Sequence, residues 1–204
     1  MLTAINATGN DSLVKLDCAN SNISSLILSE NAAVEYLRCI NNRLQELDLS
    51  GCAELEYLEC SLNEIEALDL SQLVKLTYLE TDNNQLTSLD VSNNSSLEFI
   101  NCSYNNISEL YMGEHPALRY FKLFKNAFTT AALDGIYCGL PMHESSVGAV
   151  LFAVYDRNSA DESFALATNT DNAAAKGWTV LDNSPAPLFA TGTFTCGSVA
   201  GIIL

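Results

Sequence analysis

A unit of 21 residues repeats along most of this chain of 204 residues. One copy reads LEYLECSLNEIEALDLSQLVK from Leu55, and the next reads LTYLETDNNQLTSLDVSNNSS from Leu76. Other copies begin at Leu13, Val34, Leu97 and, in truncated form, Leu118. A unit this short cannot bury its own apolar side chains, whereas stacked copies cover one another. The period therefore predicts a solenoid in which each copy forms one rung.

Three repeat positions are apolar in every copy that reaches them, and we expect each to form a buried row down the stack. Strands in register lie about 4.8 Å apart, so equivalent side chains of neighbouring rungs touch. The rows are position four (Leu16, Leu37, Leu58, Leu79, Ile100, Phe121), position eleven (Ile23, Leu44, Ile65, Leu86, Ile107, Phe128) and position fourteen (Leu26, Leu47, Leu68, Leu89, Leu110).

Position nine is asparagine in all copies after the first. The residues are Asn42, Asn63, Asn84, Asn105 and Asn126. Each rung must turn sharply after its strand, which leaves backbone groups without strand partners. An amide side chain supplies both a donor and an acceptor to such groups. We interpret this row as structural, and not as a catalytic or sugar-binding set.

Position fifteen carries a row of aspartates, Asp48, Asp69 and Asp90. Two carboxylates one strand apart repel by about 1–2 kcal/mol at an effective dielectric constant near 40. Each aspartate is followed two residues later by serine. This spacing predicts that each carboxylate accepts a backbone N–H in an Asx turn. A bridging calcium ion is the weaker alternative, because calcium requires six to eight oxygen ligands.

Position six is cysteine in most copies, namely Cys18, Cys39, Cys60 and Cys102. We expect these to be buried free thiols, which behave as small hydrophobic groups. Side chains in register lie farther apart than a disulfide prefers, and a straight row does not converge as zinc ligands do. Cys52 falls in a turn after the repeat's second half, and we expect it to be the most exposed thiol.

The main surface feature is a stripe of aromatic residues at position three. It comprises Tyr36, Tyr57, Tyr78, Phe99 and Tyr120, preceded by Lys15. Tyrosine offers a large contact area and a polar tip, so the stripe is a candidate platform for a protein or a sugar. The alternative is a self-packing row that shields the sheet with residues favouring strands.

Charged residues at position five lie beside the stripe. This row reads Asp17, Arg38, Glu59, Glu80, Asn101 and Lys122. With Glu35, Glu56 and Glu98 of position two, the middle of this face is acidic, whereas Arg119, Lys122 and Lys125 make its C-terminal end basic. Glu59 and Glu80 are adjacent, but an open sheet offers no enclosing walls for a glycosidase site.

The overall charge limits the partners. Nine Lys and Arg residues oppose 25 Asp and Glu residues, which gives a formal net charge of −16. Nucleic acids and anionic membranes bind clustered cations, so neither is an expected partner. The apolar runs from Val147 and from Val199 are too short to cross a bilayer.

The repeat ends after Phe128. Before the first complete copy, we expect Leu2 and Ile5 to cover the open end of the stack. Beyond the last copy, two strands are expected to extend the sheet, so that 129–194 covers the final rung. The expected elements are a helix at 129–141 with Thr130 as N-cap, a strand at 147–155, a polar connector at 161–170, a short helix capped by Asp171, and a strand at 178–181.

The shared pattern LxxLxCxxNxLxxLDLS resembles the internalin-like leucine-rich repeats of Bacteroides-type bacterial surface proteins. The match covers Leu13 to Phe128, and ALDGIYCGLP and NAAAKGW resemble the segment that often follows such repeats. The resemblance implies a leucine-rich-repeat solenoid with a parallel sheet on its concave face and an α+β C-terminal cap. The expected division is a cap segment 1–12, a solenoid 13–128 and a capping region 129–204.

The resemblance also implies export to the cell surface or the medium. No signal peptide is visible in MLTAINATGN, so export implies that one has been removed. In an exported protein, Cys138 and Cys196 are candidates for a disulfide that pins the tail to the cap helix.

The sequence contains no recognisable catalytic motif. Its two histidines, His115 and His143, lie in unrelated turns, and we expect no enzyme activity, metal or cofactor. The favoured function is recognition of a protein or peptide by a monomer, through the concave face. The candidate residues are Tyr36, Tyr57, Tyr78, Phe99, Tyr120, Arg38, Glu59, Glu80 and Lys122. Glycan binding on the tyrosine stripe and a spacer role without a ligand are the alternatives.

Overall fold

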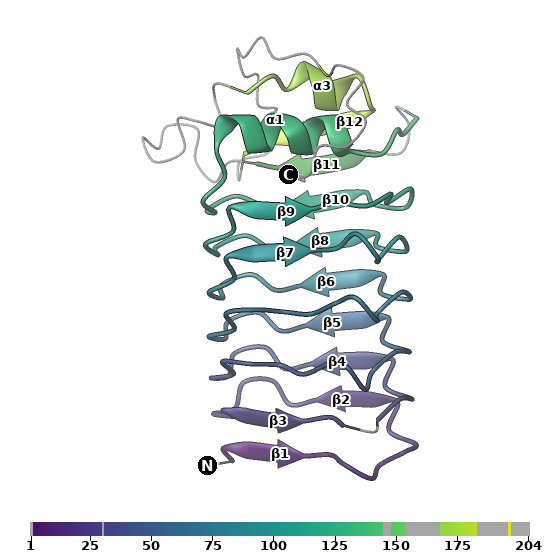
Figure 1. Cartoon of the computed structure of the whole chain (residues 1–204), viewed down its shortest axis with the longest axis vertical. Helices are drawn as coiled ribbons and strands as arrows, with labels where there is room; N and C mark the ends of the chain where they lie inside the picture. Colours follow the sequence, from purple (N-terminus) through teal and green to yellow (C-terminus); the bar gives the residue numbers. More distant parts are fainter. Residues whose placement is uncertain (1, 30, 145–147, 154–167, 183–195, 197–204) are drawn as a thin grey trace.

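The chain forms a parallel β-solenoid of the leucine-rich-repeat type, closed at its C-terminal end by helices and two further strands (Figure 1). A computed structural model describes residues 2–29, 31–144, 148–153, 168–182 and 196. Figure 1 shows the rungs stacked as an upright column, with one strand of each rung facing the rear. The solenoid architecture predicted from the period is confirmed.

The rear strands form a sheet of eight parallel strands, called the main sheet below, in the order β12-β11-β10-β8-β6-β5-β4-β2. Its register pairs Tyr36 with Tyr57 and Leu58 with Leu79, so each strand contacts the equivalent residues of the next copy. The strands are β2 (Lys15–Asp17), β4 (Tyr36–Arg38), β5 (Tyr57–Glu59), β6 (Tyr78–Glu80), β8 (Phe99–Asn101), β10 (Tyr120–Lys122), β11 (Ala149–Phe152) and β12 (Trp178–Leu181).

The front of the column carries two separate strand pairs. They are β1 (Ala4–Asn6) with β3 (Ser25–Ile27), and β7 (Ser88–Asp90) with β9 (Glu109–Tyr111). β1 pairs in the same register as the later rungs, so the segment before Leu13 already follows the repeat. Within it, Ile5 packs on the core, whereas Leu2 is 58% exposed and does not cover the first rung as predicted.

The predicted apolar rows form one continuous core. Leu37, Leu58 and Leu79 of position four are fully buried, as are the isoleucines and leucines of position eleven. Two members are only half-buried: Leu16 in β2, the edge strand, and Leu68 on the front of the column. Burial of a leucine side chain contributes about 1.5–3 kcal/mol, so these rows are the main source of the solenoid's stability.

The asparagines of position nine hold the turns together, as predicted. The Nδ2 of Asn84 donates to the carbonyls of Cys60 and Thr81 at 3.1 and 3.2 Å, and its Oδ1 accepts the Ile65 N–H at 3.0 Å. The same bonds recur one rung away at Asn63 and Asn105. Each amide therefore joins its own rung to the preceding one.

One feature of the turns was not predicted. The residue at position eight has a left-handed backbone in every copy, with φ between 52° and 57°. Asparagine tolerates this conformation better than other residues with a Cβ. Three of the six residues are asparagine, which is the signal that sequence reasoning missed. The row is Asn20, Asn41, Leu62, Asn83, Tyr104 and Lys125.

The aspartates of position fifteen form the predicted Asx turns. Oδ1 of Asp48, Asp69 and Asp90 accepts the backbone N–H of the serine two residues later, at 2.9–3.0 Å. These bonds favour the ionised form and lower the pKa of Asp48 and Asp69.

The prediction that Cys52 is exposed was wrong, because the Cys52 side chain is fully buried. It occupies position nineteen, which points inward in other rungs as well. Asn31 and Asn94 are fully buried at this position, and His115 is 2% exposed. Asn94 donates to the carbonyls of Leu70 and Leu73 at 3.0 and 2.8 Å, so this row braces the front turns.

The cysteines of position six are buried free thiols, as predicted. Burial raises the pKa of Cys18 to about 11 and that of Cys60 and Cys102 to about 12. Because only the thiolate is nucleophilic, these groups are unreactive in the folded protein.

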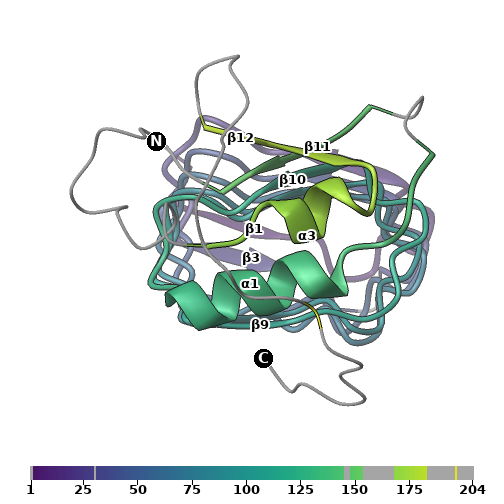
Figure 2. The same ribbon diagram turned by 90° about the horizontal axis from the view of Figure 1, so that it is seen from above.

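The C-terminal elements lie over the last rung. α1 (Thr130–Gly139) and α3 (Asp171–Ala174) pack together, and Figure 2 shows both helices across the end of the column. Strands β11 and β12 extend the main sheet beyond β10, as predicted. The N-caps differ from the prediction by one residue, because Thr129 accepts the Ala132 N–H and α3 follows Thr170. The connector predicted at 161–170 lies largely outside the described residues.

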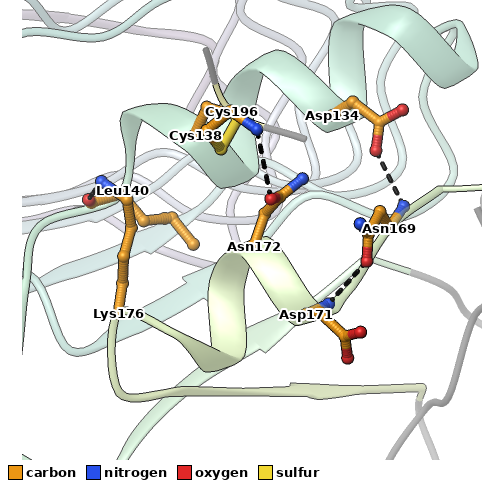
Figure 3. Close-up of a disulfide and its surroundings, with 8 residues drawn as sticks. All are labelled: Asp134, Cys138, Leu140, Asn169, Asp171, Asn172, Lys176 and Cys196. Carbon is orange, nitrogen blue, oxygen red and sulfur yellow. Dashed lines mark hydrogen bonds between the residues drawn. A yellow bond between two sulfur atoms is a disulfide. The ribbon is translucent and has the colours of Figure 1, made fainter. Parts of the chain in front are cut away.

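A disulfide joins Cys138 of α1 to Cys196, with 5.5 Å between the Cα atoms (Figure 3). Neighbouring bonds tie the two helices together: Asp134 accepts the Asn169 N–H at 2.8 Å, and the Lys176 ammonium donates to the Leu140 carbonyl at 2.8 Å. The Cys196 N–H also donates to Asn172 Oδ1 at 3.4 Å. The segment at Cys196 is thus attached to both helices.

Candidate binding face

The aromatic stripe of position three is a continuous stack of rings, called the aromatic ladder below. Neighbouring ring centroids lie 4.3–4.6 Å apart, with interplanar angles of 7–10°. The strand register fixes this spacing, since each ring projects from the same position of adjacent strands. The ladder is Tyr36, Tyr57, Tyr78, Phe99 and Tyr120.

Both ends of the aromatic ladder are also covered. The Lys15 ammonium lies 4.0 Å from the centroid of the Tyr36 ring. At the other end the Phe152 ring lies 5.4 Å from the Tyr120 ring, and the Lys122 ammonium lies over both. The ring faces are therefore occupied by neighbours, and the ladder presents ring edges and hydroxyl groups to a partner.

A chain of polar contacts fixes the N-terminal half of this face. The Glu59 carboxylate accepts from Arg38 Nε at 2.9 Å and from the Tyr57 hydroxyl at 3.1 Å. Arg38 also lies 3.4 Å from Asp17. Glu59 is only 9% exposed, so this ion pair is shielded from water on one side. Burial, followed by the nearby carboxylate, raises the pKa of Tyr57 to about 12.

A second set of contacts fixes the middle of the face. The Tyr78 hydroxyl donates to Glu80 at 2.8 Å, and burial followed by this bond raises the pKa of Tyr78. Asn101 Nδ2 donates to Glu80 at 3.2 Å and to Asp82 at 3.0 Å, and Ser61 donates to Asp82 at 2.6 Å. Sequence reasoning missed Ser61 and Asp82, which share position seven and lie two residues beyond the acidic row.

The charge of the face changes along its length. Glu35, Glu56 and Glu98 of position two are exposed beside the aromatic ladder, and the half-buried Glu80 lies next to it. Toward the cap the cations are Arg119, which is exposed, and Lys122, which is half-buried. The main sheet therefore presents prearranged polar groups, with an acidic middle and a basic C-terminal end.

The arrangement provides no evident catalytic centre within the described ranges. No group of three or more His, Cys, Asp or Glu residues there could hold a metal ion. His115 and His143 each contact a backbone carbonyl, of Asn94 and Leu118, and lie in separate turns. The same part of the chain contains no helix of the length and apolarity needed to cross a bilayer.

No protein-family model matches the chain, and a search of curated proteins found no match. Among solved structures, one similar to this chain is the functional domain of InlJ from Listeria monocytogenes, which includes a cysteine ladder. The two sequences are 23% identical, and the TM-score is 0.42. The match covers 75% of this chain and 42% of that one. The APL1 leucine-rich repeat domain is 20% identical with a TM-score of 0.49, over 69% of this chain and 44% of that one.

An internalin (inlF) from Listeria monocytogenes is 14% identical with a TM-score of 0.45, over 84% of this chain and 67% of that one. This chain spans less than half the length of the InlJ and APL1 structures. At these identities the likeness concerns the fold alone.

Proposed function

We propose that the protein is a monomeric recognition module that binds a protein or peptide through the main sheet, outside the cytoplasm. The observation that carries this proposal is the aromatic ladder with its fixed polar edge. Groups held in place before binding lose little entropy when a partner arrives. The binding residues are proposed to be Tyr36, Tyr57, Tyr78, Phe99, Tyr120, Arg38, Glu59, Glu80 and Lys122, joined by Asp82.

The ladder geometry favours a protein partner over a glycan. A sugar that stacks on an aromatic residue needs a free ring face, but each ring of the aromatic ladder is covered by its neighbours. Ring edges, hydroxyl groups and a shielded ion pair suit a flat protein surface, where tyrosine and arginine dominate binding energy.

The bonding state of the cysteines supports a location of the protein in an oxidising compartment. Cys138 and Cys196 are paired, and the other five cysteines are buried within the solenoid. Disulfides persist mainly in exported proteins, where an exposed free thiol would be a liability. This pattern supports the proposed location at the cell surface or in the medium.

The test is a pull-down from extracellular and surface protein fractions with matched charge variants. Glu56→Lys/Glu98→Lys alters exposed groups on the main sheet and spares the aromatic ladder. Glu66→Lys/Glu114→Lys makes the same charge change at exposed positions away from this sheet. We expect a captured protein to be lost with the first variant and retained with the second.

Three results would overturn the proposal. Capture that is equal for both variants would show that the main sheet does not select the partner. A glycan array that gives signal with the native protein, and loses it with Glu56→Lys/Glu98→Lys, would support the glycan alternative. Absence of any specific capture, with a silent array, would support the spacer alternative.

A further inference from the structure

The front of the column contains a gap in its strand ladder. β1 pairs with β3 and β7 pairs with β9, but the equivalent stretches 46–48 and 67–69 form no strand (Figure 1). Across residues 31–144, which are described without a break, no hydrogen bond involves the backbone N–H or C=O groups of these two stretches. The backbone donors and acceptors that a strand ladder would pair therefore have no hydrogen-bond partner within this described range.

The gap coincides with the row of aspartates. Where the ladder is intact, Asp90 lies opposite Tyr111 and Asn6 lies opposite Ile27. Closing it would place Asp69 between Asp48 and Asp90. Like charges directly opposite one another destabilise strand pairing, which gives the opening a physical cause.

The opened stretch forms a groove of about 660 Å³. Apolar side chains line it, among them Leu68, which is half-buried, and Ile27, which is 43% exposed. Four carboxylates, of Glu46, Asp48, Asp69 and Asp90, line it as well, and no Lys or Arg does. A lining of apolar side chains and carboxylates, without cations, distinguishes this groove from the main sheet, where cations are present.

We propose that this groove binds an extended cationic peptide segment in which Lys or Arg residues alternate with apolar residues. The apolar side chains pack on Leu68 and Ile27, while the long basic side chains reach the carboxylates that line the groove. This site lies on the opposite side of the column from the main sheet, so it does not depend on the recognition proposed there.

The experiment measures fluorescence anisotropy of a labelled peptide, GKLKLKG, titrated with the full chain. The comparison peptides are GKSKSKG, which lacks the apolar residues, and GELELEG, which reverses the charge. Asp48→Asn/Asp69→Asn removes two charges from the groove lining and keeps the oxygen that accepts the Ser50 and Ser71 N–H groups. Glu56→Gln/Glu98→Gln makes the same change in net charge on the main sheet.

We expect GKLKLKG to bind the native protein and to lose about tenfold in affinity with Asp48→Asn/Asp69→Asn, but little with Glu56→Gln/Glu98→Gln. Leu68→Ser, which keeps every charge, is also expected to weaken binding. Equal losses in the two double variants would show general attraction to an acidic protein and overturn the proposal. Absence of binding, or equal binding of GKSKSKG, would overturn it as well.

Discussion

At the residue scale, the asparagines of position nine add side-chain hydrogen bonds between rungs to the backbone bonds of the stack. Asn84 is 8% exposed, and its Oδ1 accepts the Ile65 N–H, so its removal leaves this buried donor unpaired. The carbonyls of Cys60 and Thr81 keep the bonds that Asn63 and Asn105 donate. An unpaired buried polar group costs about 1–3 kcal/mol.

Asn84→Ala is therefore expected to lower the free energy of unfolding by about 1–3 kcal/mol, because the buried Ile65 N–H loses its acceptor. Denaturant unfolding provides the measurement. Asn106→Ala, at an exposed position, is the control and is expected to change stability by less than about 0.5 kcal/mol. Equal effects of the two substitutions would contradict the structural role of the row.

His115 links stability to pH. Its Nδ1 lies 3.1 Å from the Asn94 carbonyl and its Nε2 accepts the Gly113 N–H at 3.3 Å, an arrangement that requires the neutral ring. Burial lowers the pKa of His115. As pH falls below about 6.5, the unfolded chain gains a proton that the folded protein resists, so stability decreases.

We expect the free energy of unfolding to fall between about pH 7 and pH 5, and to fall less in His115→Asn. The measurement is denaturant unfolding across this range, with His143 present in both proteins. The lowered pKa values of Asp48 and Asp69 act in another window, since their contribution is lost only below about pH 4. Identical pH profiles for the two proteins would rule out this role of His115.

At the element scale, the aspartate row explains why the front ladder is interrupted. Asp69→Asn keeps the Asx turn and removes the central charge, so it is expected to stabilise the protein by about 0.5–1 kcal/mol at low ionic strength. Hydrogen exchange at residues 46–48 and 67–69 should slow as the ladder closes. The gain in the free energy of unfolding should be smaller in high salt, because salt screens the repulsion between the carboxylates.

Asp69→Ala is the matched control, because it removes the charge together with the acceptor of the Ser71 N–H. It is expected to gain less stability than Asp69→Asn. If Asp69→Asn leaves both stability and exchange unchanged, like-charge repulsion is not the cause of the gap.

The period alone predicted the rungs, the asparagine row and the Asx turns, because each is a local bond repeated by the register. It did not predict that Cys52 is buried. That residue was considered as part of a turn, although Asn31, Asn94 and His115 share its repeat position. Comparison at a spacing of 21 residues would have indicated an inward row.

The candidate surfaces were less predictable. The aromatic stripe was visible in sequence, but whether its rings offer faces or edges depends on the distance between strands, which only the structure supplies. The repulsion among Asp48, Asp69 and Asp90 was predicted as well. We expected the Asx turns to offset it, and did not predict that 46–48 and 67–69 would form no strand.

At the scale of the whole molecule, stability in a solenoid is transmitted mainly between neighbouring rungs. The Cys138–Cys196 disulfide closes a segment of 58 residues outside the repeats. Cys138→Ser/Cys196→Ser is expected to cost about 2–4 kcal/mol, concentrated in the C-terminal elements.

Hydrogen exchange should show faster exchange in α1 and α3 of this variant, with the rungs from β2 to β8 unchanged. A uniform loss of protection over all rungs would show that the disulfide stabilises the column as a single cooperative unit.

Site-directed photo-crosslinking tests most directly whether the main sheet is the recognition surface. A photoreactive residue is placed at Glu56, at Glu98 or, as the control, at Glu114, and is irradiated with the partner captured by the native protein. Crosslinks from Glu56 and Glu98, with none from Glu114, are the predicted result. Crosslinks from Glu114 alone, or equally from all three positions, would contradict it.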